Sequence, residues 1–111
     1  MSKILLVDPP WYIFQGIKSD SVSCGLMSVA TVLSENGHEC LVFNGDFTTE
    51  SLKGKEGILV DYSRYLYELE HRTAPVWSEF RQVLEDFIPD YVAITVPTAK
   101  YGSALEIGRI V

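Results

Sequence analysis

The chain opens on Lys3-Ile4-Leu5-Leu6-Val7-Asp8-Pro9-Pro10, an apolar run that ends at an aspartate and two prolines. An uninterrupted apolar run is typical of a strand that is buried on both faces of a sheet. Proline ends such a strand because it has no N–H to donate to the ladder. The run therefore predicts a buried first strand over residues 4–7, followed by a loop that begins at Asp8.

Two further apolar runs predict buried strands, at residues 40–43 and 91–96. Apolar residues at helical spacing lie between the strands and predict helices near residues 22–36 and 75–88. The buried faces of these helices are expected to carry Val22, Leu26, Val29 and Leu33 in the first, and Trp77, Phe80, Leu84, Phe87 and Ile88 in the second.

Local signals place the ends of the helices. Asn36-Gly37 predicts a left-handed stop for the first helix, and Pro75 opens the second. Ser103-Ala104-Leu105-Glu106 matches a capping box and predicts a helix from residue 103 onward. Residues 46–75 are interpreted as an insertion, with a short helix whose shared face carries Tyr62, Tyr65, Leu66 and Leu69.

The alternation of strands and helices predicts an α/β fold with a parallel sheet and helices on both faces. We expect a Rossmann-like sheet of flavodoxin-like order, with the first strand between the second and the third. The ligand crevice then lies between the first and third strands, where the loops at residues 8–16 and 97–102 meet. Such sheets carry about five strands, so residues 1–111 are interpreted as the amino-terminal portion of an incomplete domain.

Composition excludes several classes of function. The 111 residues carry a net charge of -6 with scattered basic residues, which argues against nucleic-acid and membrane binding. No apolar run approaches the ~20 residues of a transmembrane helix, and the first residues do not resemble a signal peptide, so we expect a cytoplasmic protein. Cys24 and Cys40 are expected to be buried thiols, and no metal ligands are predicted.

No catalytic residues are predicted in this chain. The loop at residues 8–16 lacks the early glycines of a dinucleotide fingerprint and the lysine of a P-loop. A phosphorelay receiver needs an aspartate at the end of the third strand, where Val96-Pro97-Thr98 stands, and a hydrolase elbow is absent. His38 is expected in a turn at the amino edge of the sheet, and His71 in a solvated, charged segment.

The aromatic residues of the first loop have two interpretations. Trp11, Tyr12 and Phe14, next to the proline pair, would form a stiff apolar wall that suits the face of a large, flat ligand. Alternatively, they only cover the edge of the sheet.

Several stretches together resemble the amino-terminal cobalamin-binding domain of cobalamin-dependent radical S-adenosylmethionine enzymes. The resemblance covers nearly the whole chain and rests on the opening residues 3–10, on Gly25-Leu26 before a helix that ends at residues 33–39, and on residues 89–95. Trp77 and the amphipathic helix that leads into Pro89-Asp90 look like members with an insertion before the third strand, including proteins of the anaerobic Mg-protoporphyrin monomethyl ester cyclase type.

The resemblance implies a domain that holds cobalamin over the carboxyl edge of the sheet, with the nucleotide tail between strands. The motif Asp-x-His-x-x-Gly is missing, so base-off cobalamin without a protein histidine on cobalt is expected. The 4Fe–4S cluster and S-adenosylmethionine belong to a downstream domain, because two cysteines cannot hold the cluster. The parent enzyme would carry out methyl transfer or cyclase-type chemistry, and this chain alone would be no enzyme.

The expected cobalamin contacts lie in the loops at the carboxyl edge and at the start of the first helix. Hydroxyl groups after the third strand would bind amide arms or the nucleotide tail, whereas Ser23-Cys24-Gly25 replaces the Pro-Leu-Gly of many members. The expected site comprises Asp8, Pro9, Pro10, Trp11, Tyr12, Gln15, Gly16, Gly25, Asn44, Thr95, Pro97, Thr98 and Ser103.

Two other classes of function stay open. The chain is then either a module that binds another flat cofactor, such as a flavin, or a protein-interaction half-domain. The remainder of the parent enzyme is an expected partner. An unpaired edge of the third strand or the last helix also predicts self-association.

Overall fold

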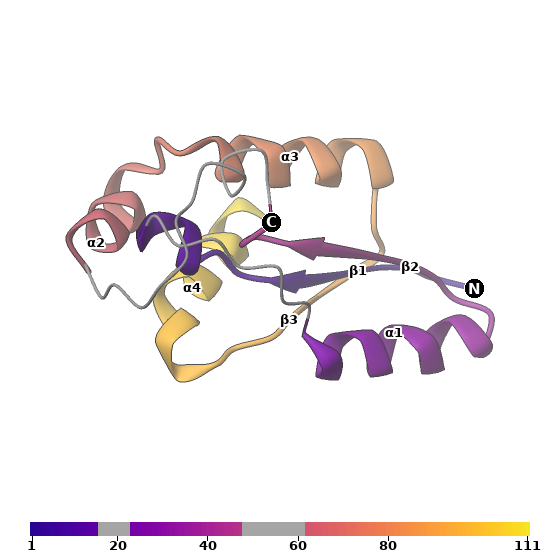
Figure 1. Cartoon of the computed structure of the whole chain (residues 1–111). Helices are drawn as coiled ribbons and strands as arrows, with labels where there is room; N and C mark the ends of the chain where they lie inside the picture. Colours follow the sequence, from indigo (N-terminus) through magenta and orange to yellow (C-terminus); the bar gives the residue numbers. More distant parts are fainter. Residues whose placement is uncertain (16–22, 48–61) are drawn as a thin grey trace.

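The computed structural model describes residues 1–15, 23–47 and 62–111. Within them, three parallel strands form a sheet in the order β2-β1-β3 (Figure 1). The strand β1 (Lys3–Asp8) lies between β2 (Glu39–Asn44) and β3 (Tyr91–Ile94), with Leu5 opposite Leu41 and Val92. The predicted α/β class, strand order and parallel pairing are confirmed, and the arrangement is compatible with a Rossmann-like fold.

Helices cover both faces of this sheet. Figure 1 shows α1 (Cys24–Glu35) on one side and α3 (Pro75–Phe87) on the other. The helices α2 (Tyr62–His71) and α4 (Tyr101–Ile110) lie toward the carboxyl ends of the strands, as does the short 3-10 helix η1 (Tyr12–Gln15). A second 3-10 helix, η3 (Thr98–Lys100), leads directly into α4. The helix predicted within the insertion is therefore α2, whereas residues 48–61 of that insertion lie outside the described residues.

The three strands differ in burial because only β1 has a neighbour on each side. Residues Ile4–Asp8 of β1 are all buried, which confirms the buried strand predicted at residues 4–7. The prediction that the other two strands are buried is wrong, because exposed and partly buried residues alternate along β3 and along most of β2. The third strand also ends at Ile94, two residues before the predicted Val96.

The ends of the helices agree with the predicted signals in two places. The Ser23 hydroxyl caps α1 by accepting the Leu26 N–H, and Gly37, with a φ of 86°, follows the helix in the left-handed region. Pro75 is the first residue of α3. These residues therefore set where α1 begins and ends and where α3 begins.

Three details of the helices correct the predictions. The helix α4 begins at Tyr101, so Ser103 lies inside it and is buried, and no capping box forms because η3 continues directly into the helix. Ile88 caps the end of α3 in the left-handed region, with its side chain exposed instead of on the apolar face. Val29 is also exposed, and Ala30 takes its place in the buried face of α1.

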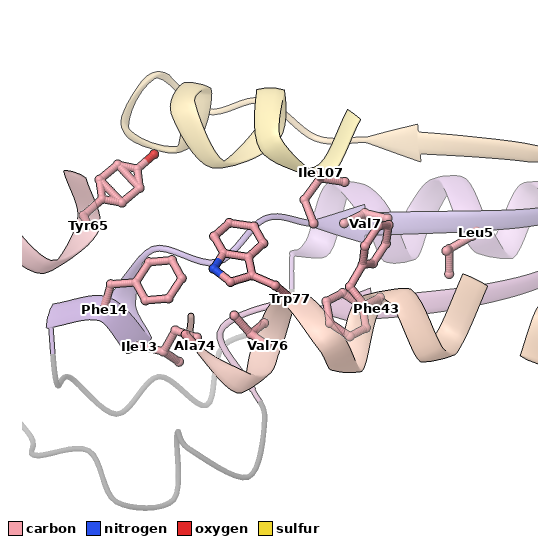
Figure 2. Close-up of a cluster of buried hydrophobic side chains, with 11 residues drawn as sticks. Leu5, Val7, Ile13, Phe14, Phe43, Tyr65, Ala74, Val76, Trp77 and Ile107 are labelled. Atoms are coloured by element: carbon pink, nitrogen blue, oxygen red, sulfur yellow. The ribbon is translucent and has the colours of Figure 1, made fainter. Parts of the chain in front are cut away.

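Side chains of β1 divide the core into two clusters, because successive residues of a strand point to opposite faces. Leu5 and Val7 pack against α3 and the elements around it, in a cluster that also contains Ile13, Phe14, Phe43, Tyr65, Ala74, Val76, Trp77, Phe80 and Ile107 (Figure 2). Ile4 and Leu6 pack against Leu26 and Ala30 of α1 in a smaller cluster.

The cysteines are less buried than predicted, whereas the histidines lie where the sequence places them. Cys24 is exposed on the first turn of α1 and Cys40 is partly buried in the edge strand β2. His38 lies at the amino edge of the sheet, where its Nδ1 accepts the Ser2 N–H at 3.2 Å. His71 is exposed at the end of α2.

Candidate functional site

A buried lysine joins three loops at the carboxyl edge of the sheet. The ammonium of Lys100 donates to Asp8 Oδ1 at 2.7 Å and to Asp46 Oδ2 at 2.8 Å. Asp8 ends β1, Asp46 follows β2, and Lys100 follows β3. The predicted meeting of the loops after the first and third strands is confirmed, and the loop after β2 joins them.

Asp46 also holds the backbone of the first loop. Its Oδ1 accepts the N–H groups of Trp11 at 2.7 Å and Ile13 at 3.3 Å. Its own N–H donates to the side-chain oxygen of Asn44 at 3.0 Å. Asn44, one of the expected ligand contacts, therefore stabilises the turn that leads to Asp46. Asp46 therefore fixes both where the first loop leaves β1 and where η1 begins.

The turn at Gly45 brings two of these loops into direct backbone contact. The Gly45 N–H donates to the Asp8 carbonyl at 2.8 Å. A Cβ atom at Gly45 would lie 2.6 Å from the Pro10 nitrogen and 2.8 Å from the Asp8 carbonyl oxygen. Only glycine allows this approach, so the position of the Asp8-Pro9-Pro10 segment depends on it.

The charge of this cluster limits what the edge can bind. Burial by itself lowers the pKa of the Lys100 ammonium, but the charges and hydrogen bonds of Asp46 and Asp8 outweigh it and raise the pKa above its ordinary value. Lys100 is therefore a cation whose charge is already shared by two carboxylates. It supplies neither a free amine for nucleophilic attack nor a free cation for a phosphate group.

The three aromatic residues of the first loop divide between core and surface. Phe14 is buried and stacks on Trp77 and Tyr65, with centroids 5.5 and 6.2 Å apart, so the interpretation as a cover for the sheet holds for this residue (Figure 2). Trp11 contacts Tyr12 edge to face, and the Tyr12 ring is 38% exposed beside Lys100. Tyr12 is the ring that a ligand at the edge can reach.

Trp11 also carries a buried donor without an acceptor. Its indole Nε1 has no hydrogen-bond partner among the described residues. A buried indole N–H normally finds a partner, and one that is left unpaired costs about 1–3 kcal/mol.

An apolar groove of about 350 Å³ lies between α1 and β3. Its mouth is close to the carboxyl edge, because Gly25 is at the start of α1 and Thr95 follows the end of β3. A Cβ atom at Gly25 would meet only the Ser23 hydroxyl at 3.9 Å, so the fold does not require glycine there. The groove is lined by Leu6, Gly25, Leu26, Val29, Ala93, Ile94 and Thr95.

The structure places the expected site residues in different surroundings. Trp11, Tyr12, Pro97 and Thr98 lie at the carboxyl edge, and Gly25 and Thr95 line the groove. Asp8 is held by Lys100, and Pro9 and Pro10 are fully buried. The Ser103 hydroxyl is also occupied, because it bonds the Lys100 carbonyl and the Tyr65 hydroxyl. Gln15 belongs to η1, and Gly16 lies outside the described residues.

Asp46 and Lys100 were not among the residues expected from the sequence. The available signal is that polar residues follow three neighbouring strands, and parallel strands bring their carboxyl ends to one edge. A lysine after one strand and aspartates after two others then predict an ion-paired cluster.

The described residues hold neither a metal-binding cluster nor a membrane-spanning helix. Residues 1–15, 23–47 and 62–111 contain no group of three histidine, cysteine, aspartate or glutamate side chains that would hold a metal ion. The same residues contain no helix long and apolar enough to cross a membrane. Comparisons of the chain with protein-family models, with curated proteins and with solved structures find no match.

Proposed function

We propose that the chain binds cobalamin at the carboxyl edge of its sheet, as the amino-terminal domain of a cytoplasmic cobalamin-dependent radical S-adenosylmethionine enzyme. The observation that carries the proposal is the apolar groove between α1 and β3, which opens beside this edge. The nucleotide tail of cobalamin ends in a flat, apolar benzimidazole, and the groove offers apolar walls for such a ring. In this proposal the corrin lies over the edge and the tail enters the groove.

The residues of the groove fit the proposed tail. Gly25 keeps the groove open because it places no side chain between α1 and β3, although the backbone would accept one. Ala93 contributes a small side chain from β3, and Leu6 and Leu26 form the floor and wall. The Thr95 hydroxyl, at the mouth, would bind a polar group of the tail. A volume of about 350 Å³ suits one ring system and leaves the rest of the ligand outside.

The loops at the edge fit the proposed corrin. Lys100 and Asp46 hold the first loop in place, so that Tyr12 and Trp11 are presented with little remaining freedom. Neither His38 nor His71 belongs to the three loops that Lys100 joins, which supports base-off binding without a histidine on cobalt. When bound, cobalamin would supply methyl-transfer or cyclase-type chemistry to the parent enzyme, while the residues here bind and orient it.

The charge of the edge favours this ligand over a flavin mononucleotide. A flavin phosphate needs backbone donors or free cations, and the one described cation at the junction of the loops is neutralised by Asp8 and Asp46. Asp8, Asp46 and Lys100 together carry one net negative charge. A phosphate monoester, with close to two negative charges, would be repelled there more strongly than the singly charged phosphodiester of the cobalamin tail.

The proposal is tested by titrating the protein with hydroxocobalamin and recording the absorbance spectrum. Gly25→Leu fills the groove without disturbing α1, because a Cβ fits there and leucine favours a helix over glycine. Binding should weaken at least about tenfold, since a blocked subsite loses more than ~1.4 kcal/mol. The matched control is Gly108→Leu, because a Cβ at Gly108 in α4 meets nothing within 4 Å.

The outcomes separate the open alternatives. Equal affinity of the Gly25→Leu and unmodified proteins would show that the tail does not use the groove. An unchanged cobalamin spectrum, with no cobalamin retained on gel filtration, would overturn the proposal. Riboflavin in a parallel titration then distinguishes a flavin module from a protein-interaction half-domain.

A further inference from the structure

A second hollow lies where α2 ends, α3 begins and α4 ends. It has a volume of about 240 Å³ and is lined by His71, Arg72, Trp77, Ser78, Arg81 and Ile110. Three of these side chains are basic, in a chain whose net charge is -6. Two of the three are charged arginines, and only Arg72 has a carboxylate partner among the described residues, so the hollow would attract an anion.

Arg72 occupies a backbone position that does not favour arginine. Its φ is 51°, and its N–H donates to the Glu68 carbonyl at 2.9 Å to close the end of α2. Glycine or asparagine usually takes this left-handed position, and other residues there cost roughly 1 kcal/mol. The strain places the guanidinium beside α4, where its Nε lies 3.7 Å from Glu106 Oε2. A strained residue that lines a cavity is a common mark of a binding site.

The other polar groups around the hollow are either free or held in position. Arg81 is exposed and forms no ion pair within the part of the chain that the structure describes. The His71 ring stacks on Tyr67 with centroids 4.0 Å apart, and its Nδ1 faces the Tyr67 carbonyl at 2.9 Å. This contact assigns the proton to Nδ1 and leaves Nε2 for another partner.

We propose that this hollow binds the phosphate group of an organic phosphate, at a site independent of the carboxyl edge. The guanidinium groups of Arg72 and Arg81 provide planar pairs of donors that match phosphate oxygens. Ile110 and the small part of Trp77 that is exposed, 4%, line the same hollow and supply apolar surface for the organic part of the ligand. The combination of two arginines with this apolar surface favours a phosphate monoester over a free inorganic ion.

The test uses the full chain and three probes, namely phenyl phosphate, inorganic phosphate and benzoate, each followed by calorimetry. Phenyl phosphate should bind saturably and more tightly than the other two. Arg81→Gln should weaken its binding about tenfold, as expected when a charged hydrogen bond is lost. Arg72→Gly should weaken it by a similar factor, and glycine suits the φ of 51°, so the backbone is relieved rather than strained.

Lys3→Gln is the matched control, because it removes one positive charge at the other end of α3. The Lys3 ammonium bonds the carbonyl of Phe87, the last residue of that helix. The affinity of this variant for phenyl phosphate should stay within about twofold of the unmodified protein. Equal weakening by Lys3→Gln and Arg81→Gln would overturn the proposal, because only net charge would then matter. No saturable heat with phenyl phosphate, or equal binding of benzoate, would also overturn it.

Discussion

The two faces of the sheet differ in how completely they are covered. On one face, β1 packs against α3, with side chains from α2, α4 and η1 closing the same cluster. On the other face, α1 is the one described helix that packs against Ile4 and Leu6, and the described residues leave a groove beside β3. The first face therefore holds the fold and the loops in place, and the second leaves apolar surface free for a ligand.

Polar groups reinforce the covered face. Glu68 is buried there and accepts hydrogen bonds from the N–H groups of Thr73 and Ala74 and from the Trp77 indole. Tyr65 reaches across to α4, where its hydroxyl accepts the Ser103 N–H at 3.0 Å. These bonds tie α2 to α3 and to α4, so the helices around the larger cluster are fixed to one another.

The largest expected contrast is between core truncations on the two faces. Phe80→Ala should lower the free energy of unfolding by about 4 kcal/mol, because Phe80 is fully buried and a cavity would remain. Leu26→Ala should cost about 2 kcal/mol, since Leu26 borders a groove that is already open. Urea denaturation measures both changes. Equal losses would show that the two faces contribute alike and that the groove is closed in solution.

The ion-paired cluster at the carboxyl edge should give the next largest effect. Lys100→Met should lower the free energy of unfolding by about 3 kcal/mol, because it leaves Asp8 and Asp46 buried without a counter-charge. Adding Asp46→Ala to this variant should cost less than Asp46→Ala costs alone, which a double-mutant cycle detects. Additive losses would mean that the lysine and the aspartate do not stabilise each other.

Glu68 provides a smaller test within the covered face. Glu68→Gln should lower the free energy of unfolding by about 2 kcal/mol, because a neutral amide oxygen accepts the N–H groups of Thr73 and Ala74 less strongly than a carboxylate oxygen does. Glu70→Gln is the control, since Glu70 is an exposed residue of the same helix. Chemical denaturation should separate the two variants clearly. A loss for Glu68→Gln as small as that for Glu70→Gln would contradict the role of Glu68 in joining α2 to α3.

The sequence predicts the covered face better than the open one. The first strand is apolar throughout and buried throughout, so pattern and structure agree. Residues 91–94 are mostly apolar, yet β3 is half exposed because it is an edge strand and α1 does not extend over it. The prediction that Val29 is buried is wrong for the same reason, because helical spacing identifies one face of a helix but not the element that covers that face. Burial of edge elements depends on tertiary neighbours, which local periodicity does not contain.

For the candidate site, the sequence predicts the loops but not the residues that hold them. Lys100 pairs with Asp8 across 92 positions and with Asp46 across 54, and no local motif links them. Ser103 is the opposite case, because the sequence predicts it as a ligand contact. In the structure its hydroxyl bonds the Lys100 carbonyl and the Tyr65 hydroxyl. A residue's position after a strand can be predicted, whereas its partner requires the geometry of all three strand ends.

Alkaline pH should produce a smaller change that depends on the same cluster. Although burial opposes the charge of Lys100, Asp46 and Asp8 raise its pKa in the folded protein above the ordinary value of 10.5. A raised pKa stabilises the folded state fully below about pH 10.5, and this stabilisation is lost as the pH rises toward the folded-state value. The difference in unfolding free energy between the unmodified protein and Lys100→Met should therefore shrink above that pH. A constant difference up to pH 12 would contradict the raised pKa.

The smallest expected effect is on the outer surface of α1. Val29 and Val32 are 49% and 57% exposed, so the double variant Val29→Ser and Val32→Ser should change the free energy of unfolding by less than about 0.5 kcal/mol. Leu26→Ser is the control for burial on the same helix and should cost several times more. If the double variant instead costs more than about 1 kcal/mol at high protein concentration, another copy covers this surface. Sedimentation separates this outcome from the self-association predicted through the edge of β3 or through α4, because such an assembly persists in the double variant, whereas an assembly through α1 dissociates.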